Sequence, residues 1–198
     1  MTRTFIAIAL PDGVKDALAR QIAYLRKRLP ASVRWVPAES LHLTLAFLGE
    51  LDDARLAEAE QATEVAAREA SPFALHLTRP GSFGPARSPR VLWAGVSGAG
   101  ADLAALGNAQ ARLAAGLELR DFPPEERPFS PHLTLARIKE PLPDEVGRGL
   151  PTLLAAVPAQ HAAWKVRELC VMKSERLPAG ARYTCLRTCV LRAASADA

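Results

Sequence analysis

The tetrapeptide HLTL occurs twice in the chain, at residues 42–45 within WVPAESLHLTLAFLGE (35–50) and at residues 132–135 within PFSPHLTLAR (128–137). Both copies show the polar/apolar alternation that is typical of a β-strand with one buried face. In such a strand the two leucines point to one side, and the histidine and threonine point to the other. Each copy therefore predicts a strand that buries leucine in the core and presents a His/Thr pair on the opposite face.

The surroundings of the two copies also match. Each copy begins about forty residues after a short apolar segment, FIAIAL (5–10) in one case and VLWAGV (91–96) in the other. Because the same motif recurs at the same place in two successive halves, we interpret the chain as an internal duplication. The repeats extend over approximately residues 4–80 and 90–192.

Hydrophobic spacing and turn residues predict further elements in both repeats. The predicted helices are 12–29, 53–70, 102–117 and 144–156, and the predicted strands are 5–10, 34–36, 41–48, 73–78, 91–96, 132–138, 164–172 and 183–191. This order predicts an α+β protein with two similar lobes and a cleft between them. The spacing alone leaves open whether the strands pair in parallel or antiparallel.

The composition is that of an ordinary globular protein. The chain has 198 residues, a formal net charge of +4, 49% hydrophobic residues and 23% charged residues. Its apolar runs are far shorter than the about 20 residues that a membrane-spanning helix needs, so no membrane span is predicted. The first apolar run is short and an acidic residue soon follows it, so no targeting segment is predicted and the cytoplasm is the expected compartment.

Two histidines on opposite sides of a substrate are what acid–base displacement at phosphorus requires. Near neutral pH one imidazole can be neutral and accept a proton, while the other is protonated and donates one. Threonine hydroxyls can donate hydrogen bonds to the phosphoryl oxygens. This chemistry needs no metal or cofactor, and none is predicted, because the sequence has no HExxH motif and no GxxxxGK[ST] loop.

The chain contains a third HxT sequence that serves as an internal comparison. His76 and Thr78 have this spacing, but Arg79 and Pro80 are expected to end the strand, and no second copy lies at the repeat distance. We predict that His76 lies on the exposed side of its strand and has no catalytic role. His161 stands alone and is interpreted as a structural or surface residue.

The three cysteines all lie near the end of the chain, without a CxxC pair. Cys185 and Cys189 are an even number of residues apart and are expected to share one face of a strand, where they could in principle bind zinc together with His161. The preferred interpretation is that these cysteines, like Cys170, are small buried hydrophobic residues.

With their flanking residues, the two HLTL segments resemble the paired HxTx signatures of the 2H phosphoesterase superfamily. The resemblance is closest to its bacterial and archaeal RNA 2′,3′-cyclic phosphodiesterases, historically called 2′-5′ RNA ligases. FIAIALP (5–11), RVLWAGV (90–96) and VMKSERLPAGARY (171–183) are also similar to this family, so the resemblance covers nearly the whole chain. It implies one bilobal domain over residues 1–198. Each lobe would be an antiparallel sheet with helices on its outer face, and a central groove would carry both HxTx strands.

The resemblance also implies a reaction and a role for each motif residue. The reaction is metal-independent hydrolysis of RNA 2′,3′-cyclic phosphate ends to 2′-phosphomonoesters. His42 would be the proton donor and His132 the proton acceptor, while Thr44 and Thr134 would hold the phosphate. The expected partner is RNA with a cyclic phosphate end. No protein partner is implied, and a monomer is expected.

Two further residues follow the motifs at equivalent places. Arg137 matches a basic residue of the family and would suit contact with phosphate or the RNA backbone. It lies five residues after His132, an odd number, so an unbulged strand would point it away from the cleft. Phe47 occupies the corresponding place after the first motif and is predicted to pack in the core.

Other functions use the same residues. ATP-independent ligation at a 2′-5′ junction would run a related transesterification backwards, with an RNA 5′-hydroxyl in place of water. A non-catalytic module that binds RNA ends would keep the fold without turnover. Only 6% of the residues are aromatic, so no stacking series predicts a base preference.

Overall fold

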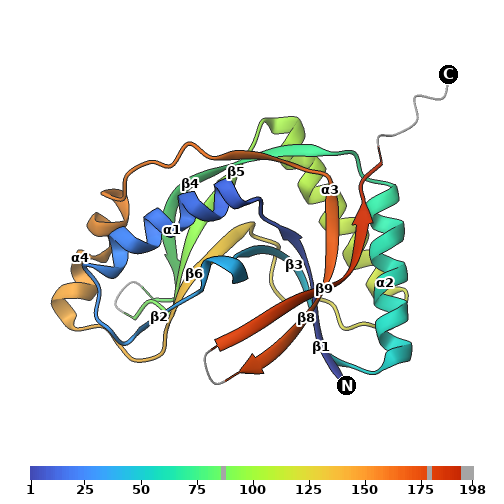
Figure 1. Ribbon diagram of the computed structural model, residues 1–198, viewed down its shortest axis with the longest axis horizontal. Helices are drawn as coiled ribbons and strands as arrows, with labels where there is room; N and C mark the ends of the chain where they lie inside the picture. Colours follow the sequence, from blue (N-terminus) through green and yellow to red (C-terminus); the bar gives the residue numbers. More distant parts are fainter. Residues whose placement is uncertain (86–87, 178–179, 193–198) are drawn as a thin grey trace.

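The computed structural model describes residues 1–85, 88–177 and 180–192 (Figure 1). Its strands form one curled sheet in which every pairing is antiparallel. The strands are β1 (Thr2–Ala9), β2 (Val33–Trp35), β3 (His42–Leu51), β4 (Phe73–Phe83), β5 (Val91–Ser97), β6 (His132–Ile138), β7 (Ala163–Val166), β8 (Glu168–Leu177) and β9 (Gly180–Val190). The helices are α1 (Asp12–Arg26), α2 (Asp53–Arg68), α3 (Gly100–Glu118) and α4 (Asp144–Ala155), with a short 3-10 helix η1 (Ala38–Ser40) before β3.

The two motif strands meet at the middle of the sheet. The strand order is β7-β4-β5-β6-β3-β1-β8-β9, and β2 also pairs with β6. The pairing between β3 and β6 joins Leu43 to Leu133. These two leucines are the same position of the two HLTL copies, so an approximate two-fold axis passes between them. The predicted α+β architecture with two similar halves is confirmed, although the halves form one continuous sheet instead of two separate ones.

Each half of the sheet contains strands from both sequence repeats. Strand β4 of the first repeat pairs with β5 of the second, and β8 of the second repeat pairs with β1 of the first. The repeats thus exchange these two strands, which links the two halves of the chain through the sheet as well as through the connection between β4 and β5.

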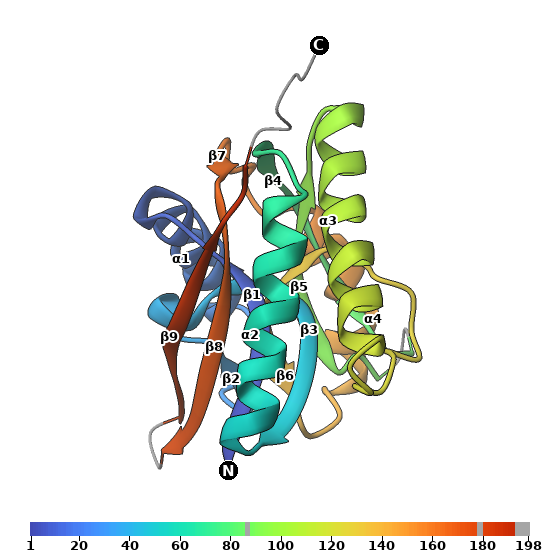
Figure 2. The same ribbon diagram turned by 90° about the vertical axis from the view of Figure 1, so that its right-hand side faces the viewer.

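The helices lie on the outer face of the sheet and supply the other side of the core. In Figure 1, α1 and α4 lie at the left and α2 and α3 at the right, and Figure 2 shows α2 and α3 packed side by side. The leucines of both motifs belong to the same buried cluster as apolar residues of all four helices. No helix in the described parts of the chain is long and apolar enough to cross a membrane.

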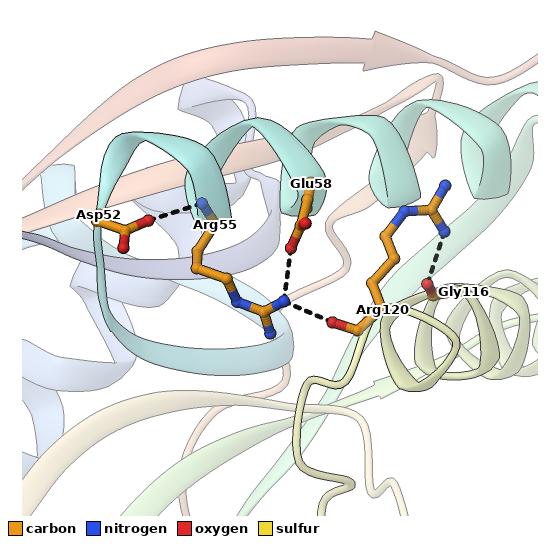
Figure 3. A network of polar contacts seen from close by, with 5 residues as sticks. All are labelled: Asp52, Arg55, Glu58, Gly116 and Arg120. Carbon is orange, nitrogen blue, oxygen red and sulfur yellow. Dashed lines mark hydrogen bonds and ion pairs between the residues drawn. The ribbon is translucent and has the colours of Figure 1, made fainter.

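A polar network joins the start of α2 to the end of α3 (Figure 3). Asp52 caps α2 by accepting a hydrogen bond of 2.8 Å from the backbone nitrogen of Arg55. The Arg55 guanidinium donates to Glu58 Oε2 at 2.5 Å and to the carbonyl oxygen of Arg120 at 2.6 Å. It also lies over the ring of Phe122, 3.8 Å from the ring centroid. These contacts tie together two helices that pack on the sheet, α2 on β1, β3, β8 and β9, and α3 on β3 and β4.

Both motif strands contain a bulge at the last leucine of the motif. In β6, Thr134 faces Trp93 and Ala136 faces Leu92, so Leu135 is an extra residue in the ladder. In β3, Thr44 faces Ala7 and Ala46 faces Ile6, so Leu45 is the extra residue.

An extra residue reverses the side-chain alternation beyond it. Arg137 therefore returns to the face of His132 and is exposed, and the expectation that an unbulged strand turns it away does not apply. Phe47 returns to the face of His42 in the same way and is 58% exposed, so the prediction that it packs in the core is wrong.

Several other expectations need correction. The strand predicted at 73–78 continues to Phe83, because β4 passes Pro80 at an irregularity in its ladder with β5. In this part of the described strand only one side pairs with another strand, and such an edge position or a bulge is where a strand tolerates proline. The strand predicted at 164–172 is two strands, β7 and β8, separated at Arg167.

The cysteine expectation is wrong for one residue. A register shift in the β8–β9 ladder makes Leu186 an extra residue and turns Cys185 to the opposite face from Cys189. Cys170 and Cys189 are buried as predicted, whereas Cys185 is exposed.

Replacement of Leu133 by alanine should lower the free energy of unfolding by about 2–5 kcal/mol, because it leaves a cavity at the junction of the two halves. Leu133 is 0% exposed, whereas Leu119 is 85% exposed and provides a matched control. Leu119→Ala should change stability by less than about 0.5 kcal/mol. Urea unfolding of both variants tests this, and equal losses would contradict the central role of the β3–β6 contact.

Candidate active site

His42, Thr44, His132 and Thr134 lie on one face of the sheet, which we call the histidine face. All four side chains are partly exposed, while the leucines between them are buried on the other side. If the antiparallel register at Leu43 and Leu133 is extended by one residue in each direction, His42 comes next to Thr134 and Thr44 next to His132. The structure therefore brings the four predicted site residues together.

The two imidazole rings are anchored in the same way. His42 Nδ1 lies 2.8 Å from the carbonyl oxygen of Ser40, and His132 Nδ1 lies 2.7 Å from that of Ser130. A carbonyl oxygen can only accept a hydrogen bond, so Nδ1 carries the proton and donates it in both rings. Nε2 is left for chemistry: it accepts a proton when the ring is neutral and donates one when the ring is charged.

The sequence contains a signal for this anchor that lies just outside the HLTL motifs. Both copies have serine two residues before histidine, in ESLH and in FSPH. The serine carbonyl, and not its hydroxyl, makes the contact. The anchor therefore depends on the backbone just before each motif strand and not on the serine side chain.

Aromatic side chains surround His42. The ring of Phe5, on β1, is tilted against the imidazole with a centroid distance of 4.7 Å. Tyr183, on β9, contacts the imidazole edge-on at 5.0 Å and also packs on Phe5 at 5.0 Å. Phe5 is only 3% exposed, so this cluster shields one side of His42 from water.

His132 has a different aromatic neighbourhood. Phe83 contacts its imidazole edge-on at 4.8 Å, and Trp93 packs on Phe83 at 5.2 Å. Gly81 is needed beneath Trp93, because a Cβ atom there would overlap the indole ring. Gly95, the cross-strand partner of His132, likewise leaves room for the Thr78 hydroxyl, which a Cβ atom would displace.

The aromatic residues around the two histidines were not predicted. They are distant from the motifs in sequence. Phe5 comes close through the β1–β3 pairing, Tyr183 through the pairing of β8 with β1 and β9, and Phe83 through the extension of β4.

The pKa of His42 is lowered from its ordinary value. Burial is the largest cause, because it disfavours the charged imidazole; the hydrogen bond to Ser40 opposes it, and the charges of Arg137 and His132 lower the pKa further. In the absence of substrate, the neutral form of His42 is therefore favoured. The influence of Arg137 on this pKa places its charge within electrostatic range of His42.

The other two histidines lie outside the motif strands. His76 is exposed, as predicted, and lies on β4, which is separated from the His132 strand β6 by β5. His161 lines two cavities, of about 400 Å³ and 190 Å³, between α1 and the segment before β7. Neither cavity is lined by a motif histidine or threonine, so we place the candidate site on the histidine face and not in these cavities.

A curled antiparallel sheet of two similar halves, with a matched His/Thr pair from each half on one face, defines a two-histidine type of site. The family model described as "2'-5' RNA ligase superfamily" matches residues 14–178. The chain belongs to this superfamily.

Several relatives carry the name RNA 2′,3′-cyclic phosphodiesterase. The relative from Thermus thermophilus is 34% identical over 191 residues, which cover 96% of this chain and 90% of the relative. The relative from Methanothermobacter thermautotrophicus is 31% identical over 182 residues, which cover 92% and 95% of the two chains. A Geobacillus stearothermophilus relative is 34% identical over 150 residues, and this match spans 46% of its length and 74% of the present chain.

Solved structures share the fold. The Thermus thermophilus protein TT0787 superposes with a TM-score of 0.76 at 32% identity, covering 96% of this chain and 98% of the other. LigT of E. coli complexed with 3′-AMP superposes with a TM-score of 0.72 at 27% identity and the same coverage.

In the free protein, His42 should titrate below the ordinary imidazole value of about 6.5, and Arg137→Ala should raise its pKa because a repelling positive charge is removed. The exposed Arg148 of α4 supplies a matched control, since Arg148→Ala removes the same charge elsewhere. NMR titration of the imidazole resonances measures both effects. The same shift in both variants would mean that net charge, and not the position of Arg137, controls His42.

Proposed function

We propose that the protein hydrolyses RNA 2′,3′-cyclic phosphate ends to 2′-phosphomonoesters by metal-independent acid–base catalysis. The observation that carries this proposal is the pair of imidazoles anchored alike through Nδ1, on one face with two threonine hydroxyls; among the described residues neither Nε2 has a hydrogen-bond partner. The names of the relatives support the substrate, because they act on RNA 2′,3′-cyclic phosphate. The expected compartment is the cytoplasm, and one bilobal domain acting as a monomer is sufficient for the reaction.

In the proposed reaction a water molecule attacks the phosphorus of the cyclic ester. His132 Nε2 accepts a proton from this water as its oxygen bonds to phosphorus. The bond from phosphorus to the 3′ oxygen breaks, and protonated His42 gives its Nε2 proton to that oxygen. The products are a 2′-phosphomonoester and a 3′-hydroxyl. No cofactor takes part, and both imidazoles change charge in each cycle.

The assignment of donor and acceptor follows the family resemblance, since the two motifs are identical. A proton donor must be protonated, and the lowered pKa of His42 in the empty site opposes that state. The bound phosphate is negatively charged and acts in the opposite direction. His42 would therefore gain its proton when the substrate binds, while Thr44, Thr134 and Arg137 contact the phosphoryl oxygens.

Hydrolysis should proceed in EDTA on an oligoribonucleotide that ends in a 2′,3′-cyclic phosphate. Removing one proton-transfer group typically costs about 10²–10⁴-fold in rate. His42→Ala and His132→Ala should each lose activity in this range, and the wild-type product should carry a 2′-phosphate. Product analysis by mass spectrometry and phosphatase sensitivity tests this.

His76→Ala is the matched control, because His76 belongs to the third HxT sequence and is exposed away from the site. It should keep wild-type activity. Survival of turnover in either motif variant would refute the two-histidine mechanism. Adding a 5′-hydroxyl RNA to the same assay distinguishes ligation, since joined strands formed without ATP would favour that activity, and tight binding without turnover would favour a binding module.

The proton donor can be identified with a second substrate. A phosphodiester whose leaving group is 4-nitrophenoxide departs without a proton, so it does not need the general acid. On this substrate His42→Ala should lose less than about 10-fold, while His132→Ala should still lose about 10²–10⁴-fold. The opposite pattern in the two variants would reverse the donor and acceptor assignment without affecting the two-histidine site.

A further inference from the structure

A second arginine lies directly beside Arg137. Strand β2 pairs antiparallel with β6, and in this register Arg34 is the partner of Arg137. The pair on one side of them, Val33 and Ile138, is buried, while Arg34 and Arg137 are both exposed. Cross-strand partners project from the same side of a sheet. Both guanidinium groups therefore extend from the histidine face.

Like charges directly opposite each other on two strands destabilise a sheet. Neither Arg34 nor Arg137 forms an ion pair with any acidic side chain in the described parts of the chain. The exposed residues Arg68 and Arg187 do have acidic partners. The exposed Arg148 has no acidic partner in the described parts of the chain, but it does not face a second arginine across a strand pair. The uncompensated pair is therefore a site at which an anion would relieve repulsion, and two guanidinium forks suit a phosphate group with several oxygens.

The position of the pair relative to the histidines suggests which phosphate it binds. Arg137 lies on β6, the strand that carries His132, and β2 pairs with β6 on the side opposite to β5, which is also the side of β3. Arg34 therefore lies beside Arg137 and in line with β3, the strand that carries His42. An RNA strand whose terminal phosphate lies between the histidines would place its next phosphodiester at this arginine pair.

We propose that Arg34, together with Arg137, binds the backbone phosphodiester that precedes the terminal cyclic phosphate. This inference rests on the proposed function and adds a substrate preference to it: RNA of two or more nucleotides is bound better than a cyclic mononucleotide. Arg34 is a binding residue in this scheme and takes no part in proton transfer.

The kinetic test compares a dinucleotide and a mononucleotide, each ending in a 2′,3′-cyclic phosphate. A charge-assisted hydrogen bond lost from an exposed site typically corresponds to about a tenfold loss of affinity. In Arg34→Ala the ratio of kcat/KM for the dinucleotide to that for the mononucleotide should fall about tenfold, through KM. Arg34→Lys keeps the charge but not the planar fork and should fall less. Arg148→Ala should leave the ratio unchanged, and an unchanged ratio in Arg34→Ala would overturn the proposal.

A binding measurement keeps this proposal separate from the proposed reaction. Fluorescence anisotropy with a single-stranded RNA that ends in a 2′-phosphate needs no turnover. In Arg34→Ala the slope of log K against log salt should become shallower by about 0.7, the value for one phosphate contact on single-stranded nucleic acid. If the wild type binds this RNA without hydrolysing a cyclic end, the proposed reaction fails while the Arg34 contact stands. If the slope is the same in wild type and Arg34→Ala, the contact fails whatever the activity.

Discussion

The pairing of Leu43 with Leu133 is the contact on which the arrangement of the site depends. Both side chains are fully buried where the two halves of the sheet meet. A slip of one residue between β3 and β6 would turn the leucines of one motif toward water and its histidine and threonine into the core. Burial of leucine thus fixes the register, and the register fixes which polar groups share the opposite face. The positions of the reactive groups follow from hydrophobic packing on the side of the sheet that takes no part in the chemistry.

This dependence explains what could be predicted from the sequence. The alternation in HLTL is local, so the faces of His42, Thr44, His132 and Thr134 follow from it directly, and the duplication follows from the two copies. The bulges at Leu45 and Leu135 could not be predicted in this way, because a leucine is equally suitable in a regular strand and in a bulge. The bulges affect the two residues that come two positions after them, Phe47 and Arg137. For Arg137 the family resemblance predicts a site residue although the regular spacing points it away from the cleft; for Phe47 the sequence predicts core packing, which the bulge makes wrong. The extension of β4 past Pro80 depends on the lack of a strand partner on one side, which is a property of the whole sheet.

The two halves are alike in backbone but not in their side chains. Each histidine is anchored by the carbonyl of the serine two residues before it. Their other neighbours differ, because His42 contacts Phe5 and Tyr183, while His132 contacts Phe83. Phe47 and Arg137 occupy equivalent places after the two bulges, one apolar and one positively charged. An acid and a base must differ in protonation state, and two identical motifs in identical surroundings could not provide that difference. The asymmetry therefore has to come from residues outside the motifs. Of these, Arg137 could be named from the sequence, whereas the aromatic neighbours Phe5, Tyr183 and Phe83 could not.

Charge links these surroundings to the proposed reaction. In the empty site, burial and the nearby positive charges favour neutral His42, so the fully charged cluster of Arg137 and two imidazolium rings is avoided. A phosphate bound between Arg137 and the two imidazoles would attract all three positive charges, and would therefore raise the pKa of His42. By linkage, the factor by which phosphate strengthens protonation of His42 equals the factor by which protonation strengthens phosphate binding. Under the proposed reaction, the proton needed by the leaving oxygen would then be taken up together with the substrate. Transfer of that proton to the 3′ oxygen leaves His42 neutral, while His132 has gained a proton from water. The two imidazoles thus exchange protonation states, and the site is ready for another substrate only after His132 loses its proton to solvent.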